Sequence, residues 1–141
     1  MFGDDWYTVG LAAGLGTAFG VLLATLLVSV RGGVLFATLG ALGGGVAIGL
    51  VPWGWKEALA GGVGGALGAL GASGIVRGAL RRGGTRGATA LIVAAAAALL
   101  AALALVPVLG YLEAVVVPAL AVRLHRRSGR TYAGLRILAR D

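Results

Sequence analysis

The stretch Arg77-Gly-Ala-Leu-Arg81-Arg82-Gly-Gly-Thr-Arg86 interrupts an otherwise almost continuous apolar sequence. Its four arginines lie between two long uncharged runs, a pattern typical of a loop between membrane spans. Cytoplasmic loops of membrane proteins carry an excess of arginine and lysine. We therefore expect this arginine loop, residues 77–86, to lie in the cytoplasm and to set the direction of every flanking span.

The composition also favours a membrane protein. Of the 141 residues, 59% are hydrophobic and 12% are charged, whereas about a quarter of the residues of a soluble domain carry charge. The sequence lacks cysteine, which excludes disulfides and cysteine metal ligands. It also lacks asparagine and glutamine and is rich in arginine, alanine, glycine and leucine. This bias indicates a GC-rich bacterial genome, and we expect a multi-pass protein of the inner membrane.

Five apolar stretches are candidate membrane spans. The first contains 23 residues without a charge, enough to cross about 30 Å of hydrocarbon at 1.5 Å per residue. It follows an acidic start and the aromatic pair Trp6 and Tyr7, so we expect a retained helix with an interfacial anchor rather than a signal peptide. The predicted spans are residues 8–30, 34–51, 58–76, 87–106 and 108–122.

The fifth stretch is short and contains Glu113 and Pro118, so its role depends on topology. The arginine loop and the arginine-rich tail after Val122 should both be cytoplasmic, which requires an even number of crossings between them. A four-helix chain would put the tail outside or keep the fourth span from crossing. We predict an all-α polytopic integral membrane bundle over residues 1–122. It has five transmembrane helices, the N-terminus out and the C-terminus in, and it precedes a basic amphipathic tail over 123–141.

The net charge of +7 comes from arginines that flank apolar runs. The expected partner is therefore the anionic inner-leaflet headgroups of the bilayer, and no nucleic acid. A short helix at residues 131–140 is expected to lie on this leaflet, with a docking peptide for a cytoplasmic partner as the alternative. The arginines predicted to contact anionic lipid are Arg77, Arg81, Arg82, Arg86, Arg123, Arg126, Arg127 and Arg130.

The sequence contains 27 glycines, which are concentrated in the first three predicted spans. Small residues let membrane helices approach closely, so these spans should form a tight core with the fourth span at its periphery. Glycine recurs on more than one face of the second and third spans, which favours a homo-oligomer or a partner helix. The predicted packing residues are Gly10, Gly14, Gly16, Gly20, Gly40, Gly44, Gly45, Gly49, Gly61, Gly65 and Gly68.

Glu113 is the one acidic residue inside an apolar span and is a candidate ion or proton site. Pro118 frees a backbone carbonyl near Ala114 that can act as a second oxygen ligand. The alternative is a structural carboxyl near the outer headgroups, bonded to Tyr111 or to hydroxyls of neighbouring helices. The candidate site therefore comprises Glu113, Tyr111 and Pro118. No set of side chains forms a metal cluster or a catalytic pair, so we expect no enzyme activity and no cofactor.

These observations favour a non-enzymatic accessory, scaffolding or assembly subunit that oligomerises through glycine-rich helices. The alternative is a small oligomeric transporter or channel that uses Glu113 as its ionisable site. An enzyme that acts on lipids ranks third, because the basic face can hold a phosphate but no residue is placed to do the chemistry.

Overall fold

The computed structural model describes residues 5–138, and this part of the chain is helical with no strand. Side chains of α5 are described up to Arg127, with the exceptions of Pro107 and His125. The predicted all-α class is therefore confirmed. The helices are α1 (Asp5–Leu27), α2 (Gly33–Leu50), α3 (Trp55–Arg81), α4 (Arg86–Leu103) and α5 (Pro107–Leu138).

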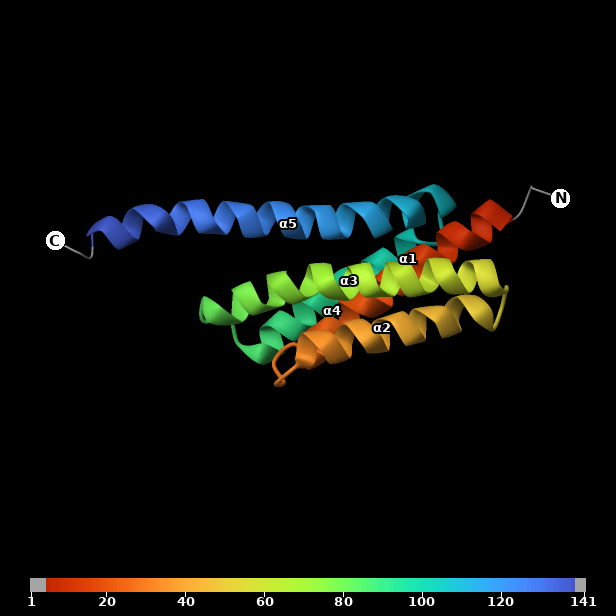
Figure 1. The fold of residues 1–141 in the computed structure, drawn as a ribbon, viewed down its shortest axis with the longest axis horizontal. Helices are drawn as coiled ribbons and strands as arrows, with labels where there is room; N and C mark the ends of the chain where they lie inside the picture. Colours follow the sequence, from red (N-terminus) through yellow and green to blue (C-terminus); the bar gives the residue numbers. More distant parts are fainter. Residues whose placement is uncertain (1–4, 139–141) are drawn as a thin grey trace.

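Helices α1 to α4 are long and apolar enough to cross a membrane, which supports a membrane protein. Successive helices run in opposite directions (Figure 1). Only part of the arginine loop forms the turn between α3 and α4, because residues 77–81 continue α3 and Arg86 begins α4. This turn lies at the same end of the bundle as the C-terminal part of α5. The turns that follow α2 and α4 lie at the opposite end, together with the start of α1.

Helices α1, α2 and α3 pack against one another through glycine. A Cβ placed on Gly61 of α3 would meet the carbonyl of Gly45 on α2 and would lie 3.4 Å from the carbonyl oxygen of Ala12 on α1. One turn later, a Cβ on Gly65 would meet the carbonyl of Ala41. These glycines let three backbones approach at once, which is the close packing that lipid-embedded helices need.

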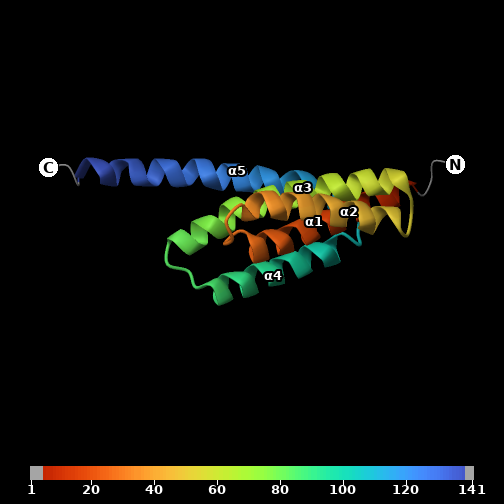
Figure 2. The same ribbon diagram turned by 60° about the horizontal axis from the view of Figure 1, so that its bottom comes forward.

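Helix α4 is peripheral, as the sequence predicts, and packs mainly on α1. Ala97 is its one buried residue among those described. Helix α5 packs on α1 and α3 instead. Figure 2 shows that α4 and α5 share a short turn and then diverge along their lengths. The two helices therefore cover different sides of the central trio.

Polar bonds join α1 to α3 and to the turn between α4 and α5 at the end opposite the arginine loop. Lys56 forms an ion pair of 3.0 Å with Asp5, and the Thr8 hydroxyl donates to the Glu57 carboxylate at 2.7 Å. The Tyr7 hydroxyl donates to the carbonyl of Leu105, which follows α4, at 3.4 Å. These bonds connect the start of α1 to the start of α3 and to the turn that leads into α5. The exposed Trp6, Trp53 and Trp55 belong to the same end.

Helix α5 continues past Val122, where the predicted span ends, to Leu138 without a break. Pro118 lies inside this helix. The residues predicted as a separate tail helix thus begin within α5. Their expected position on the inner leaflet stays a prediction, and Arg140 lies outside the described residues.

Candidate functional site: a buried carboxyl between α5 and the core

Glu113 lies on the face of α5 that contacts the core. Gly110, three residues earlier, packs against the carbonyl of Gly10 on α1. Val117, four residues later, packs on a cluster that includes Val21 of α1 and buried alanines of α3 and α4. Residues at these spacings share one helix face. Glu113 therefore lies between the close contacts made by Gly110 and by Val117, and the residue is 6% exposed.

Both carboxylate oxygens of Glu113 lack a hydrogen-bond partner among the described residues. The hydroxyls of the core are engaged elsewhere, since Thr17 donates to the carbonyl of Ala13 at 2.8 Å and Ser73 to that of Ala69 at 2.6 Å. The alternative prediction, that Glu113 bonds to Tyr111 or to such hydroxyls, is therefore wrong. A buried ionised carboxylate without a partner is costly, so this group needs a proton or a cation.

The two other members of the candidate site take different positions. The hydroxyl of Tyr111 donates to the carbonyl of Trp6 at 2.8 Å, so it ties α5 to α1 instead of contacting Glu113. Pro118 packs on α3, where its Cα would lie 3.4 Å from a Cβ on Gly71. Because proline has no N–H, the carbonyl of Ala114 has lost its helical donor, as expected.

The predicted packing glycines lie at contacts within the protomer. Those of α1 face two neighbours: Gly16 meets Gly61 and Gly20 meets Gly65 on α3, whereas a Cβ on Gly14 would lie 2.9 Å from the Cα of Gly110 on α5. The remaining predicted glycines also contact a neighbouring helix. Gly10 meets Gly110, Gly40 approaches Leu23, Gly44 meets Phe19, Gly45 meets Gly61, Gly49 meets Glu57, and Gly68 meets Thr17.

Gly43 of α2 and Gly74 of α3, which are not among the predicted packing residues, have open surroundings. A Cβ on Gly43 of α2 or on Gly74 of α3 would have no neighbouring atom within 4 Å. Gly43 forms an exposed row of small residues with Gly40 and Ala47 at helical spacing. A regular glycine pattern cannot separate these positions from the packed ones, because the crossing geometry of the helices decides which face is covered.

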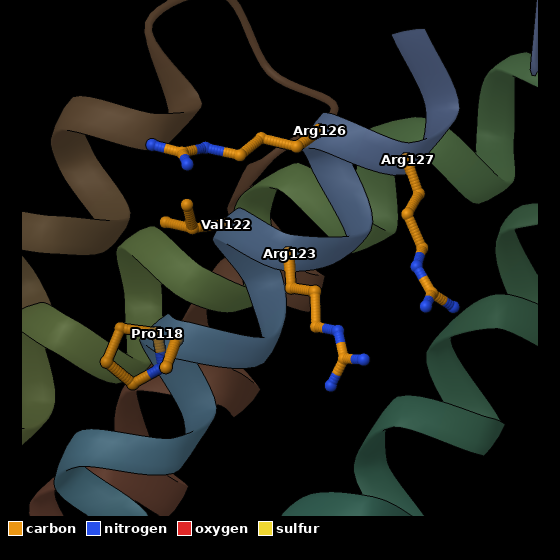
Figure 3. A pocket seen from close by; sticks show the side chains of 6 residues that line it. Pro118, Val122, Arg123, Arg126 and Arg127 are labelled. Carbon is orange, nitrogen blue, oxygen red and sulfur yellow. The ribbon is translucent and has the colours of Figure 1, made fainter. Parts of the chain in front are cut away.

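The predicted lipid-contacting arginines are exposed at one end of the molecule. Arg77, Arg81, Arg82 and Arg86 surround the turn between α3 and α4, and Arg123, Arg126 and Arg127 follow on α5. The side chain of Arg130 lies outside the described part. A cavity of about 880 Å³ lies beside α5 at this end (Figure 3). Its lining residues are Pro118, Ala119, Val122, Arg123, Arg126 and Arg127.

The described residues contain no group of three histidine or acidic side chains that could hold a metal ion. The sequence matches no family model, and no similar curated protein or solved structure was found. The class of the protein therefore follows from the fold of residues 5–138: this part is helical, and four of its helices are compatible with membrane spans.

Proposed function

We propose that the protein is a non-enzymatic accessory, scaffolding or assembly subunit of a bacterial inner membrane. It associates through its glycine-rich helices with copies of itself or with another membrane protein. The observation that carries this proposal is the exposed row Gly40, Gly43 and Ala47 on α2. Glycine in the interior of a helix costs about 1 kcal/mol relative to alanine. The packed glycines offset this cost through contacts within the protomer, and Gly43 lacks such a contact among the described residues.

The test replaces Gly43 with leucine. A leucine there meets no atom of its own protomer within 4 Å of its Cβ, but it keeps a second helix from approaching the backbone. We expect Gly43→Leu to weaken self-association or partner retention about tenfold or more. The measurement is the mass of the complex purified from native membranes in mild detergent, followed over a dilution series.

The matched control is Gly74→Leu on α3, which makes the same change at an equally open position. This variant should keep the association of the unchanged protein. Equal association of both variants with the unchanged protein would contradict the proposed interface. A monomeric unchanged protein with no second protein in the purified complex would contradict the assembly function altogether.

The proposed subunit has five spans, with its N-terminus outside and its tail in the cytoplasm. Helix α5 supports this topology, because it runs back along the bundle antiparallel to α4 (Figure 1). Its residues 108–122 are apolar apart from Glu113. The arginines of the loop and of α5 lie at one end, and Lys56 lies at the other, which agrees with an excess of basic residues on the cytoplasmic side.

A second candidate function is proton or cation transport through Glu113, and the unpartnered carboxyl favours it. Acidic groups inside membrane bundles commonly mark ion or proton pathways. In liposomes with an imposed potential, this function predicts proton uptake above that of empty liposomes. Glu113→Gln should lower the uptake at least about tenfold, because the amide neither carries an exchangeable proton of this kind nor balances a cation.

The control for transport is Tyr111→Phe, two residues away, whose hydroxyl is engaged with Trp6. It should transport at nearly the rate of the unchanged protein. Full uptake by Glu113→Gln, or no uptake by the unchanged protein with either protons or sodium ions, would remove the transport candidate and leave the assembly proposal in place.

A further inference from the structure

The cavity beside α5 combines an apolar part with a basic part. Its lining residues form two adjacent rows at four-residue spacing, and each row begins with an apolar residue and ends with arginine. One row is Pro118, Val122 and Arg126, and the other is Ala119, Arg123 and Arg127. Figure 3 shows Arg126 extending to one side of α5 and Arg123 to the other, so the basic part of the lining spreads to both sides of this helix.

The packing of α5 on α3 fixes the level of these arginines. Both helices run in the same direction, and Pro118 lies beside Gly71. Because each residue advances both helices by about 1.5 Å, Arg123 and Arg127 lie near the levels of Val76 and Leu80. The basic part of the groove is therefore level with Arg77 and Arg81 at the end of α3. The apolar part lies one to two turns deeper, beside the uncharged part of the bundle.

Described acidic side chains lie away from this groove. Asp5 and Glu57 belong to the opposite end of the bundle, where they bond to Lys56 and Thr8. Glu113 lies about three turns before the first of these arginines, on the face that contacts the core. Arg123 and Arg126 therefore lie away from the carboxylates of Asp5, Glu57 and Glu113, which suits an anionic occupant.

We propose that this groove binds one anionic phospholipid per protomer. Its phosphate contacts Arg123 and Arg126, and an acyl chain lies along Pro118, Ala119 and Val122. This inference rests on the predicted contact with anionic headgroups. It goes beyond that contact, because it assigns one lipid molecule to a defined site on α5. The choice of a lipid over a free anion follows from the apolar floor, which continues the groove toward the hydrocarbon region.

The test measures lipid retained by the full-length protein. The protein is purified in mild detergent, mixed with phosphatidylglycerol or phosphatidylcholine, and analysed by native mass spectrometry. We expect one phosphatidylglycerol per protomer and much weaker retention of phosphatidylcholine. The double substitution Arg123→Gln with Arg126→Gln should weaken phosphatidylglycerol binding about thirtyfold, given about 1 kcal/mol for each arginine.

Two further variants separate a built site from general attraction. The substitution Arg77→Gln with Arg81→Gln removes the same charge at the same level but outside the lining residues, and it should keep the bound lipid. Ala119→Trp fills the apolar floor at an exposed position without changing the charge, and it should release the lipid. Retention by Ala119→Trp would overturn the proposed acyl position.

Several outcomes would overturn the site. Equal loss of lipid in both double variants would show only a general attraction of arginines to anionic membranes. This result would contradict the site but not the predicted contact with anionic headgroups. Equal retention of the two lipids by the unchanged protein would contradict anionic recognition. Displacement of the lipid by millimolar inorganic phosphate would identify a free anion as the occupant, contrary to the proposal.

Discussion

Gly61 and Gly43 lie in similar sequence surroundings but have opposite structural roles. A Cβ on Gly61 would meet backbone atoms of Gly45, whereas a Cβ on Gly43 would meet nothing within 4 Å. A backbone atom cannot move aside as a flexible side chain can, so the two helices would have to separate. The cost of a methyl group at a glycine therefore depends on which neighbour lies opposite, more than on the number of glycines in the helix.

We predict that Gly61→Ala lowers the free energy of unfolding by about 2 kcal/mol, the usual range for overpacking in a tight core. The matched change Gly43→Ala should not lower it and should raise it by up to about 1 kcal/mol, because alanine favours a helix over glycine and meets no neighbour at this position. The measurement is unfolding in a denaturing detergent, followed by circular dichroism. Equal stability of Gly61→Ala and the unchanged protein would contradict the close contact between α2 and α3.

Glu113 shows how far a sequence can define a site. An acid inside an apolar stretch was enough to select it, and its burial agrees with that choice. Its partners were not predictable, because the direction of the Tyr111 hydroxyl depends on how α5 is rotated against α1. Only the assembled helices show that this hydroxyl bonds to Trp6 and leaves the carboxyl without a partner among the described residues.

At the scale of helices, the start of α5 is held to α1 by a close backbone contact and a hydrogen bond. Gly110 meets Gly10, and Tyr111 bonds to Trp6. The second half of α5 diverges from α4 and extends beyond the bundle (Figures 1 and 2). A change at Gly110 should therefore displace α5 while α1, α2 and α3 keep their own contacts.

This prediction is testable by cross-linking because the chain has no cysteine of its own. Cysteines placed at Gly71 and Val117, whose side chains would lie close together, should form a cross-link with a short thiol reagent. Adding Gly110→Leu should abolish most of this cross-link, since a leucine cannot fit against the Gly10 backbone. An undiminished cross-link would show that Gly110 does not hold α5 in place.

Helix positions and helix contacts differ in how well the sequence predicts them. Uncharged runs and the arginine loop indicated five helical segments, because charge marks where a segment leaves the apolar region. The continuation of α5 past Val122 was not predicted. The change from apolar to basic residues marks the end of an apolar stretch, but a helix can continue through such a change. The groove beside Arg123 also could not be predicted, because the space beside a helix depends on how the assembled helices pack.

At the scale of the whole molecule, the topology predicts which ends are accessible from outside the cell. Val106, in the exposed turn before α5, should face the outside, and the end of the tail should face the cytoplasm. A membrane-impermeant thiol reagent should therefore label Val106→Cys in intact cells. It should label a cysteine added after Asp141 only once the membrane is permeabilised. Labelling of the added cysteine in intact cells would mean that α5 does not cross.

Helix α1 contacts all four other helices, as α3 also does. It is also made first, and its Gly10 meets Gly110, which leaves the ribosome about a hundred residues later. During synthesis, the surface of α1 that finally packs on α5 must therefore stay covered by lipid or by the insertion machinery. Completion of the fold depends on the last helix to be made, so a chain released early would present the uncovered side of α1 to membrane quality control.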